Sequence, residues 1–106
     1  MPTIFYNKLI RDKIPEIIEQ SGKRPIIEQL DPEAYKKCLN AKLNEELQEY
    51  LDSDKDEELA DLVEVVYAIL KFKGVNINTF EDLRMKKAEE RGAFDKRLFL
   101  KEVDDG

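Results

Sequence analysis

The stretch from Lys42 to Leu70 most constrains what this chain can fold into, because it carries acids where a helix should be apolar. It consists of two segments with helical periodicity, separated by a short acidic turn over Asp52–Asp56. At about 100° per residue, Glu46 falls inside the apolar arc of the first segment and Glu49 on its edge. The placement therefore indicates that these carboxylates face the interior.

The second segment is apolar around most of its circumference and polar along a single stripe. Glu58 falls between two apolar positions of its helical wheel, and Asp61 lies one step further round. Two antiparallel helices would bring these carboxylates opposite Glu46 and Glu49. Four such groups at a helix–helix seam repel one another, and their burial is costly unless cations compensate. Oxygen ligands without histidine suit a hard divalent ion, which predicts Mg²⁺, with Mn²⁺ as the alternative.

Composition narrows the class of protein further. The chain has 106 residues, which predicts a single domain over residues 1–106. A net charge of -6 argues against a nucleic acid polymer as partner, and no apolar run is long enough to predict a membrane span. Cys38 is the one cysteine, so an internal disulfide is excluded, and the lack of histidine argues against thiol catalysis. These features predict a cytoplasmic protein.

The rest of the chain predicts an all-α fold with short additions at its edges. Gly22 ends a short first helix at Gln20, and Asp31 caps a long helix that reaches about Leu51. The capping pattern predicts two more helices, one capped by Ser53 or Asp54 and ending near Phe72, and one capped by Asn78 or Thr79 and ending near Arg91. Short edge strands are expected near residues 25–30 and 97–103, where they could pair.

Two groups of basic residues could contact phosphate. The first precedes the short N-terminal helix, and its alternative interpretation is a solvated surface. The second lies on the apolar side of the last helix, where long side chains can instead extend to solvent. The first group is Lys8, Arg11 and Lys13, and the second is Arg84, Lys87 and Arg91.

A metal-bound carboxylate cluster beside such cations is typical of hydrolysis at phosphorus. The ion would neutralise phosphate charge and activate a water, and a free carboxylate could accept the proton of that water. The alternative is a structural one, in which interhelical salt bridges neutralise the acids. Lys42 is the only basic residue close by on the first acidic helix, so this alternative has few partners.

At these residues the chain resembles the MazG-like, all-α nucleoside triphosphate pyrophosphohydrolases, a superfamily that includes phosphoribosyl-ATP pyrophosphohydrolase. The ExxE and ExxD motifs of that superfamily correspond to Glu46–Glu49 and Glu58–Asp61. The match extends to a small phosphoribosyl-ATP pyrophosphohydrolase-like subgroup. Its YNKLVRDKIPEII-like opening and its KxxxRGxF ending correspond to Tyr6–Ile18 and Lys87–Phe94. The spacer between the two acidic motifs is shorter than in many relatives, which puts the shape of the substrate pocket in doubt.

The resemblance implies specific roles. The metal ligands would be Glu46, Glu49, Glu58 and Asp61, with Glu45 as a further ligand or the base for water. Phosphate contacts would come from Lys8, Arg11, Lys13, Lys87 and Arg91. The resemblance also implies a MazG-like antiparallel helical bundle completed by oligomerisation, as a homodimer or homotetramer.

The resulting hypothesis is a Mg²⁺-dependent nucleotide pyrophosphohydrolase that serves nucleotide-pool housecleaning. It would cleave nucleoside or deoxynucleoside triphosphates between the α and β phosphates, giving a monophosphate and pyrophosphate. Two alternatives stay open. One is phosphoribosyl-ATP as the substrate, and the other is a helical module without catalytic activity that binds a nucleotide or a protein.

Overall fold

The computed structural model describes residues 3–106, and within that range it is all-α. Four helices follow one another: α1 (Ile14–Gln20), α2 (Pro32–Ser53), α3 (Asp56–Lys73) and α4 (Ile77–Arg91). The chain forms two compact units, one ending at Gly74 and the other beginning at Val75. The first contains α1, α2 and α3, and the second contains α4 and the C-terminal tail. The prediction of a single domain stays a prediction.

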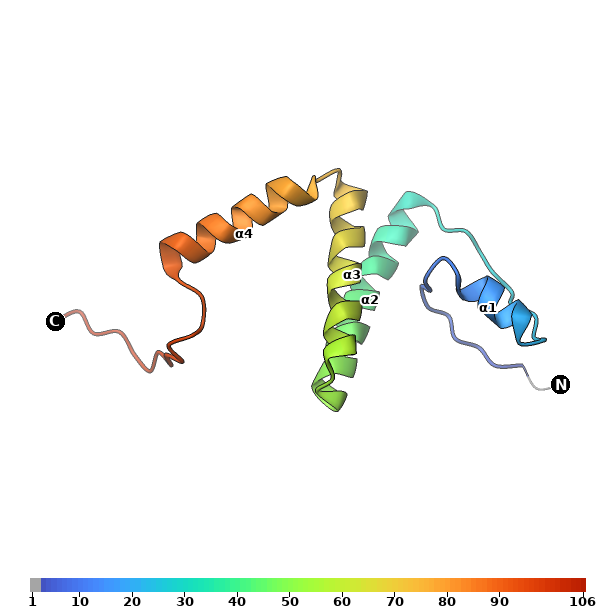
Figure 1. Ribbon diagram of the computed structural model, residues 1–106, viewed down its shortest axis with the longest axis horizontal. Coiled ribbons are helices and arrows are strands. Elements are labelled where there is room, and N and C mark those ends of the chain that lie inside the picture. The colour runs from blue at the N-terminus through green and yellow to red at the C-terminus, as the bar shows by residue number, and fades with distance from the viewer. Residues whose placement is uncertain (1–2) are drawn as a thin grey trace. The chain divides into compact units, whose positions relative to one another are not determined.

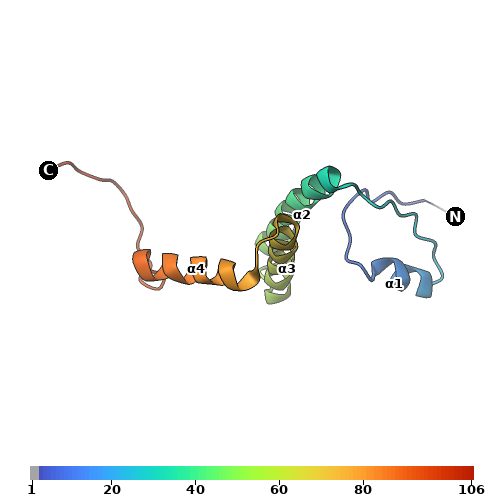
Figure 2. The same cartoon turned by 90° about the horizontal axis from the view of Figure 1, so that it is seen from above.

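An antiparallel pair of helices, α2 and α3, forms the centre of the first unit. The two helices lie side by side in both views of the molecule (Figures 1 and 2). Tyr35, near the start of α2, meets Phe72, near the end of α3, in an edge-to-face contact with ring centroids 5.6 Å apart. Leu39, Val65 and Leu70 are the buried apolar residues of the described chain. The pairing confirms the antiparallel arrangement expected from the sequence.

The turn between α2 and α3 differs in detail from the sequence prediction. Neither Ser53 nor Asp54 caps α3, because Asp54 ends α2 instead. Asp54 adopts a left-handed conformation, with φ at 59°, and its N–H donates to the carbonyl of Tyr50. Lys55 then becomes the N-cap of α3 without a side-chain hydrogen bond. Three acids in the first turn of α3 still favour its start through the helix dipole.

Other boundaries agree with the sequence or shift slightly. Asp31 caps α2 as predicted, since its side chain accepts from the N–H of Ala34. Gly74 ends α3 in the left-handed conformation expected of a C-terminal glycine. The cap of α4 is Asn76 rather than Asn78 or Thr79, because the Asn76 side chain accepts from the N–H of Asn78. The backbone N–H of Asn78, which has no partner within the helix, is therefore satisfied by the asparagine two residues before it.

The edge strands expected near residues 25–30 and 97–103 are wrong, because residues 3–106 contain no strand. A strand needs a partner for its backbone groups, and the two segments belong to different compact units. Ile26 is 83 % exposed and Phe99 is 89 % exposed, so neither apolar pattern is packed against a neighbouring strand. Arg97 also has a positive φ of 56°, which departs from extended backbone.

Candidate metal centre

Three of the predicted carboxylates meet at the seam between α2 and α3. Glu46 comes from α2, and Glu58 and Asp61 come from α3, one helical turn apart. One oxygen from each lies within 4.8 Å of the others. Glu46 is only 6 % exposed, whereas Glu58 and Asp61 are half-buried. Three of the four side chains expected at the seam from helical periodicity therefore lie together in the structure.

The buried carboxylate of Glu46 is only partly satisfied by hydrogen bonds and ion pairs. Its Oε2 atom is buried and has no hydrogen-bond partner among the described residues, while Oε1 lies 3.3 Å from the Lys42 ammonium. Desolvation raises the pKa of Glu46 above its usual value, and the neighbouring Glu49 carboxylate raises it further. A buried carboxylate oxygen without a donor is costly, and a cation is one way to satisfy it.

Desolvation also raises the pKa of Glu58, and the negative charges of Asp61, Glu57 and Glu46 raise it further. The direction is the one expected when several acids are gathered close together. The three acids thus form a site whose negative charge is incompletely neutralised by the protein.

Glu49 lies outside this group. It is exposed, although it follows Glu46 by one helical turn, and no oxygen of Glu49 belongs to the cluster. Its predicted role as a fourth ligand stays a prediction. Its position in the sequence lies on the edge of the apolar arc, where a small change in helix orientation decides between the seam and solvent.

Glu45 is held by two lysines instead of facing the cluster. Its Oε1 accepts a hydrogen bond from Lys8 at 3.4 Å, and its Oε2 lies 2.7 Å from the Lys42 ammonium. The hydrogen bond from Lys42, together with the charges of Lys42 and Lys8, holds the pKa of Glu45 below its usual value. Desolvation lowers the pKa of Lys42, but Glu45 and Glu46 outweigh that effect and leave it raised.

The N-terminal cations contact carboxylates in this structure. Arg11 donates to Asp61 across 2.6 Å, so a residue before α1 reaches the cluster from a position 50 residues earlier. Lys8 pairs with Glu45, as described above. Lys13 is the N-cap of α1, is exposed, and forms no ion pair within residues 3–106. The sequence indicated Lys42 as a nearby counter-ion but could not indicate these partners of Lys8 and Arg11.

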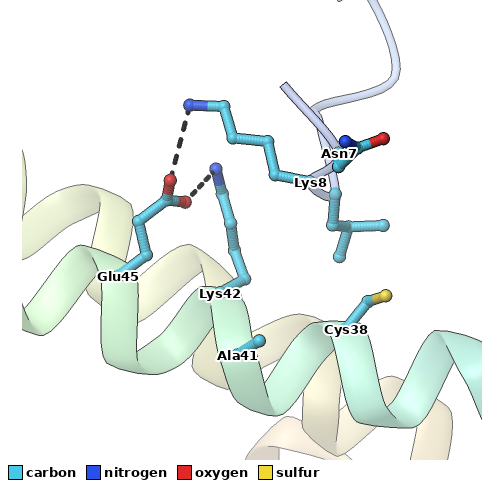
Figure 3. Close-up of a pocket in the computed structure, with 7 residues that line it drawn as sticks. Asn7, Lys8, Cys38, Ala41, Lys42 and Glu45 are labelled. Atoms are coloured by element: carbon cyan, nitrogen blue, oxygen red, sulfur yellow. Dashed lines mark hydrogen bonds and ion pairs between the residues drawn. The ribbon is translucent and has the colours of Figure 1, made fainter. Parts of the chain in front are cut away.

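A pocket of about 200 Å³ lies between the N-terminal segment and one face of α2. Figure 3 shows Lys8 and Lys42 converging on Glu45 at one end and Cys38 at the other. Its lining residues are Asn7, Lys8, Leu9, Cys38, Ala41, Lys42 and Glu45. The residues from α2 follow at helical spacing, so an i, i+3, i+4, i+7 pattern could have indicated one face, but Asn7 and Leu9 had no such signal. Cys38 is half-buried.

The cations of α4 belong to the second unit. Arg84 pairs with Glu81, one turn earlier on the same helix, and this contact lowers the pKa of Glu81. Lys87 and Arg91 are exposed and form no ion pair within the described chain. Their predicted role in phosphate binding stays a prediction.

The donor set fits a small divalent ion. Three carboxylate oxygens can converge on one hard cation, and Mg²⁺ normally keeps further positions for water or phosphate oxygens. Thiolate or imidazole ligands, which other metals favour, do not contribute to this cluster. Clusters of exposed acids also occur without any ion, so the buried, unpaired oxygen of Glu46 is the more informative feature.

Part of this chain is similar to one curated protein. The chain is 45 % identical over 47 residues to an uncharacterized protein of Mycolicibacterium smegmatis. The match covers 44 % of this chain and 48 % of that protein, so the chain spans about half the length of the curated relative it matches. No family model and no solved structure matches. Separately, none of the helices described is long and apolar enough to cross a membrane.

Proposed function

We propose that this protein is a Mg²⁺-dependent nucleotide pyrophosphohydrolase of the MazG-like type, acting in the cytoplasm. Its substrates would be nucleoside or deoxynucleoside triphosphates, cleaved between the α and β phosphates. The observation that carries the proposal is the cluster of Glu46, Glu58 and Asp61, in which one buried oxygen of Glu46 has no partner. The resemblance of nearly the whole chain to the small phosphoribosyl-ATP pyrophosphohydrolase-like subgroup of that superfamily supplies the reaction.

In this proposal each residue has a distinct task. Glu46, Glu58 and Asp61 would hold the ion, which when bound supplies charge neutralisation at phosphate and an activated water. Glu49, exposed and one turn from Glu46, is better placed to accept a proton than Glu45. The lowered pKa of Glu45 makes that carboxylate the weaker base, and its two lysines already occupy it. Lys8 and Arg11 would then contact phosphate oxygens.

A second candidate, a binding module without catalytic activity, has one observation in its favour. Lys8, Lys42 and Arg11 already pair with Glu45, Glu46 and Asp61, so part of the negative charge is neutralised within the chain. Phosphoribosyl-ATP as substrate would use the same residues as the first proposal. The two enzymatic candidates therefore differ in substrate, and both differ from the module in metal-dependent turnover.

The test is pyrophosphate release from a panel of unmodified and modified nucleoside triphosphates, with Mg²⁺ and then with EDTA. We expect release from at least one nucleotide with Mg²⁺, and its loss in EDTA. The reason is that carboxylates and phosphate are both negatively charged, so the cluster can bind phosphate only through a metal ion. Phosphoribosyl-ATP is included as a separate substrate. A folded protein that releases pyrophosphate from none of these compounds would contradict the enzymatic proposal and favour the binding module.

Self-association is the remaining part of the proposal. Leu59, Val63 and Tyr67 follow one another at single-turn spacing along α3, and each is about two-fifths exposed, at 39 %, 44 % and 42 %. A row of this kind on a two-helix pair resembles an interface more than a solvated surface. The described chain has few buried apolar residues of its own. We propose that a second copy covers this row in a homodimer or homotetramer.

Replacing Val63 by aspartate is expected to shift this oligomer toward the monomer, because a charge would be buried at the interface. The measurement is the molar mass by sedimentation or by light scattering after gel filtration, with helical content checked by circular dichroism. Asn44→Asp is the matched control, since it adds the same charge to an exposed polar position of α2. A wild-type protein that is monomeric at high concentration would contradict the proposed assembly.

A further inference from the structure

Arg11 reaches the acidic cluster from outside the α2–α3 pair. Its Nη2 atom lies 2.6 Å from Oδ1 of Asp61, and this is the one ion pair between the cluster and the N-terminal segment among the described residues. The side chains remain 56 % and 38 % exposed. An ion pair this exposed contributes little to folding, because water and salt screen it. The ion pair is therefore of interest because its acceptor, Asp61, is a proposed metal ligand, and not because of its contribution to stability.

The guanidinium and a divalent ion would compete for the same carboxylate. Asp61 Oδ1 already accepts a short charge-assisted hydrogen bond, and the positive charge of Arg11 would repel an ion placed among the three acids. Lys8 differs, because its partner Glu45 is not part of the cluster. The competition thus concerns Arg11 specifically among the cations of the N-terminal segment.

We infer that Arg11 is the resident counter-ion of Asp61 in the metal-free protein, and that a divalent ion bound at the cluster displaces it. The freed guanidinium then contacts phosphate oxygens of the substrate, for which its planar set of donors is well suited. One residue thereby exchanges a carboxylate for a phosphate as the site fills. This inference rests on the metal site proposed above, and it gives Arg11 a role in the order of binding.

The test measures Mn²⁺ binding to the metal-free, full chain by titration calorimetry. Arg11→Gln is expected to bind Mn²⁺ about twofold to fivefold more tightly than the wild type, since the competing ion pair is gone. Arg24→Gln removes the same charge from an exposed residue without a described ion pair and should leave the affinity unchanged. Lys8→Gln removes a charge nearby, at Glu45, and should have a smaller effect than Arg11→Gln. Arg11→Lys, which keeps the charge, should restore an affinity near that of the wild type.

A second titration follows the phosphate half of the inference. With Mn²⁺ saturating, Arg11→Gln is expected to weaken the binding of inorganic tripolyphosphate about tenfold, because a charge-assisted contact is lost. Arg24→Gln should bind tripolyphosphate as the wild type does. Opposite changes in the two affinities, confined to Arg11, would support the exchange of partners.

The outcomes separate this inference from the proposal beneath it. If the wild type binds Mn²⁺ but Arg11→Gln binds it no more tightly than Lys8→Gln or Arg24→Gln, displacement of Arg11 is overturned. If Arg11→Gln binds Mn²⁺ more tightly and tripolyphosphate equally well, the transfer to phosphate is overturned. If the wild type binds no Mn²⁺, the metal site itself is overturned, and this inference with it.

Discussion

Replacing Asp61 by asparagine is expected to reduce Mg²⁺-dependent pyrophosphate release by about a hundredfold or more. The change keeps the size of the side chain and removes one of the three charges that would hold the ion. An amide oxygen is a weaker ligand for Mg²⁺ than a carboxylate, and the loss should appear at saturating nucleotide. Steady-state rates measured over a range of Mg²⁺ concentrations distinguish weaker metal binding from lost turnover.

Glu64→Gln is the matched control for this experiment. It removes one negative charge from the same helix, at an exposed position outside the cluster, and should leave the rate near that of the wild type. Glu58→Gln should behave as Asp61→Asn does, since both residues come from α3. Wild-type rates in both cluster variants, with the protein folded, would show that the acids are structural and would support the binding module.

Much of the candidate site could be predicted because helical phase is local. The angle between Glu46 and its apolar neighbours is fixed by the helix itself, and burial to 6 % exposure followed from it. Glu58 and Asp61 followed in the same way from α3. Whether Glu49 faces the seam or solvent could not be predicted in this way. For a residue on the edge of the apolar arc, the small tilt between two packed helices decides which side it faces. That tilt depends on the packing of the whole seam rather than on spacing.

The contacts of Lys8 and Arg11 lie beyond what spacing can predict. Their partners are 37 and 50 residues away, and the pairing depends on how an irregular segment approaches the helix pair. The strands failed for a related reason, because alternation in one segment says nothing about whether a partner lies beside it. Helix boundaries moved by one or two residues where several capping residues compete, as Asn76 and Asn78 do.

Replacing Glu46 by glutamine is expected to stabilise the metal-free protein by about 1 kcal/mol, or to raise its Tm by about 4–8 °C. Burial disfavours the charged form of Glu46, and a neutral amide removes that cost while keeping the shape. Lys42 loses one partner but keeps Glu45 at 2.7 Å. Thermal unfolding with EDTA present measures the difference, and Glu64→Gln again serves as the control.

The dependence on pH gives this prediction a second, independent readout. Because the folded pKa of Glu46 lies above its usual value of 4.5, the folded state binds the proton more tightly than the unfolded state. This residue therefore lowers the free energy of unfolding as the pH rises from about 4.5 through the folded pKa. The advantage of Glu46→Gln should be full above that window and should shrink as the pH falls through it.

Added Mg²⁺ should reverse the order of the two proteins. An ion that binds only the folded state raises the free energy of unfolding, by about 2.7 kcal/mol at a hundred times its Kd. The wild type should gain this stabilisation, and Glu46→Gln should lose most of it. If Glu46→Gln is less stable than the wild type in EDTA, the buried carboxylate of Glu46 does not destabilise the metal-free protein, and this prediction is wrong. Equal Mg²⁺ stabilisation of both proteins would place the ion elsewhere. Glu46 would then destabilise the fold without binding the ion, and its proposed role as a metal ligand would be contradicted.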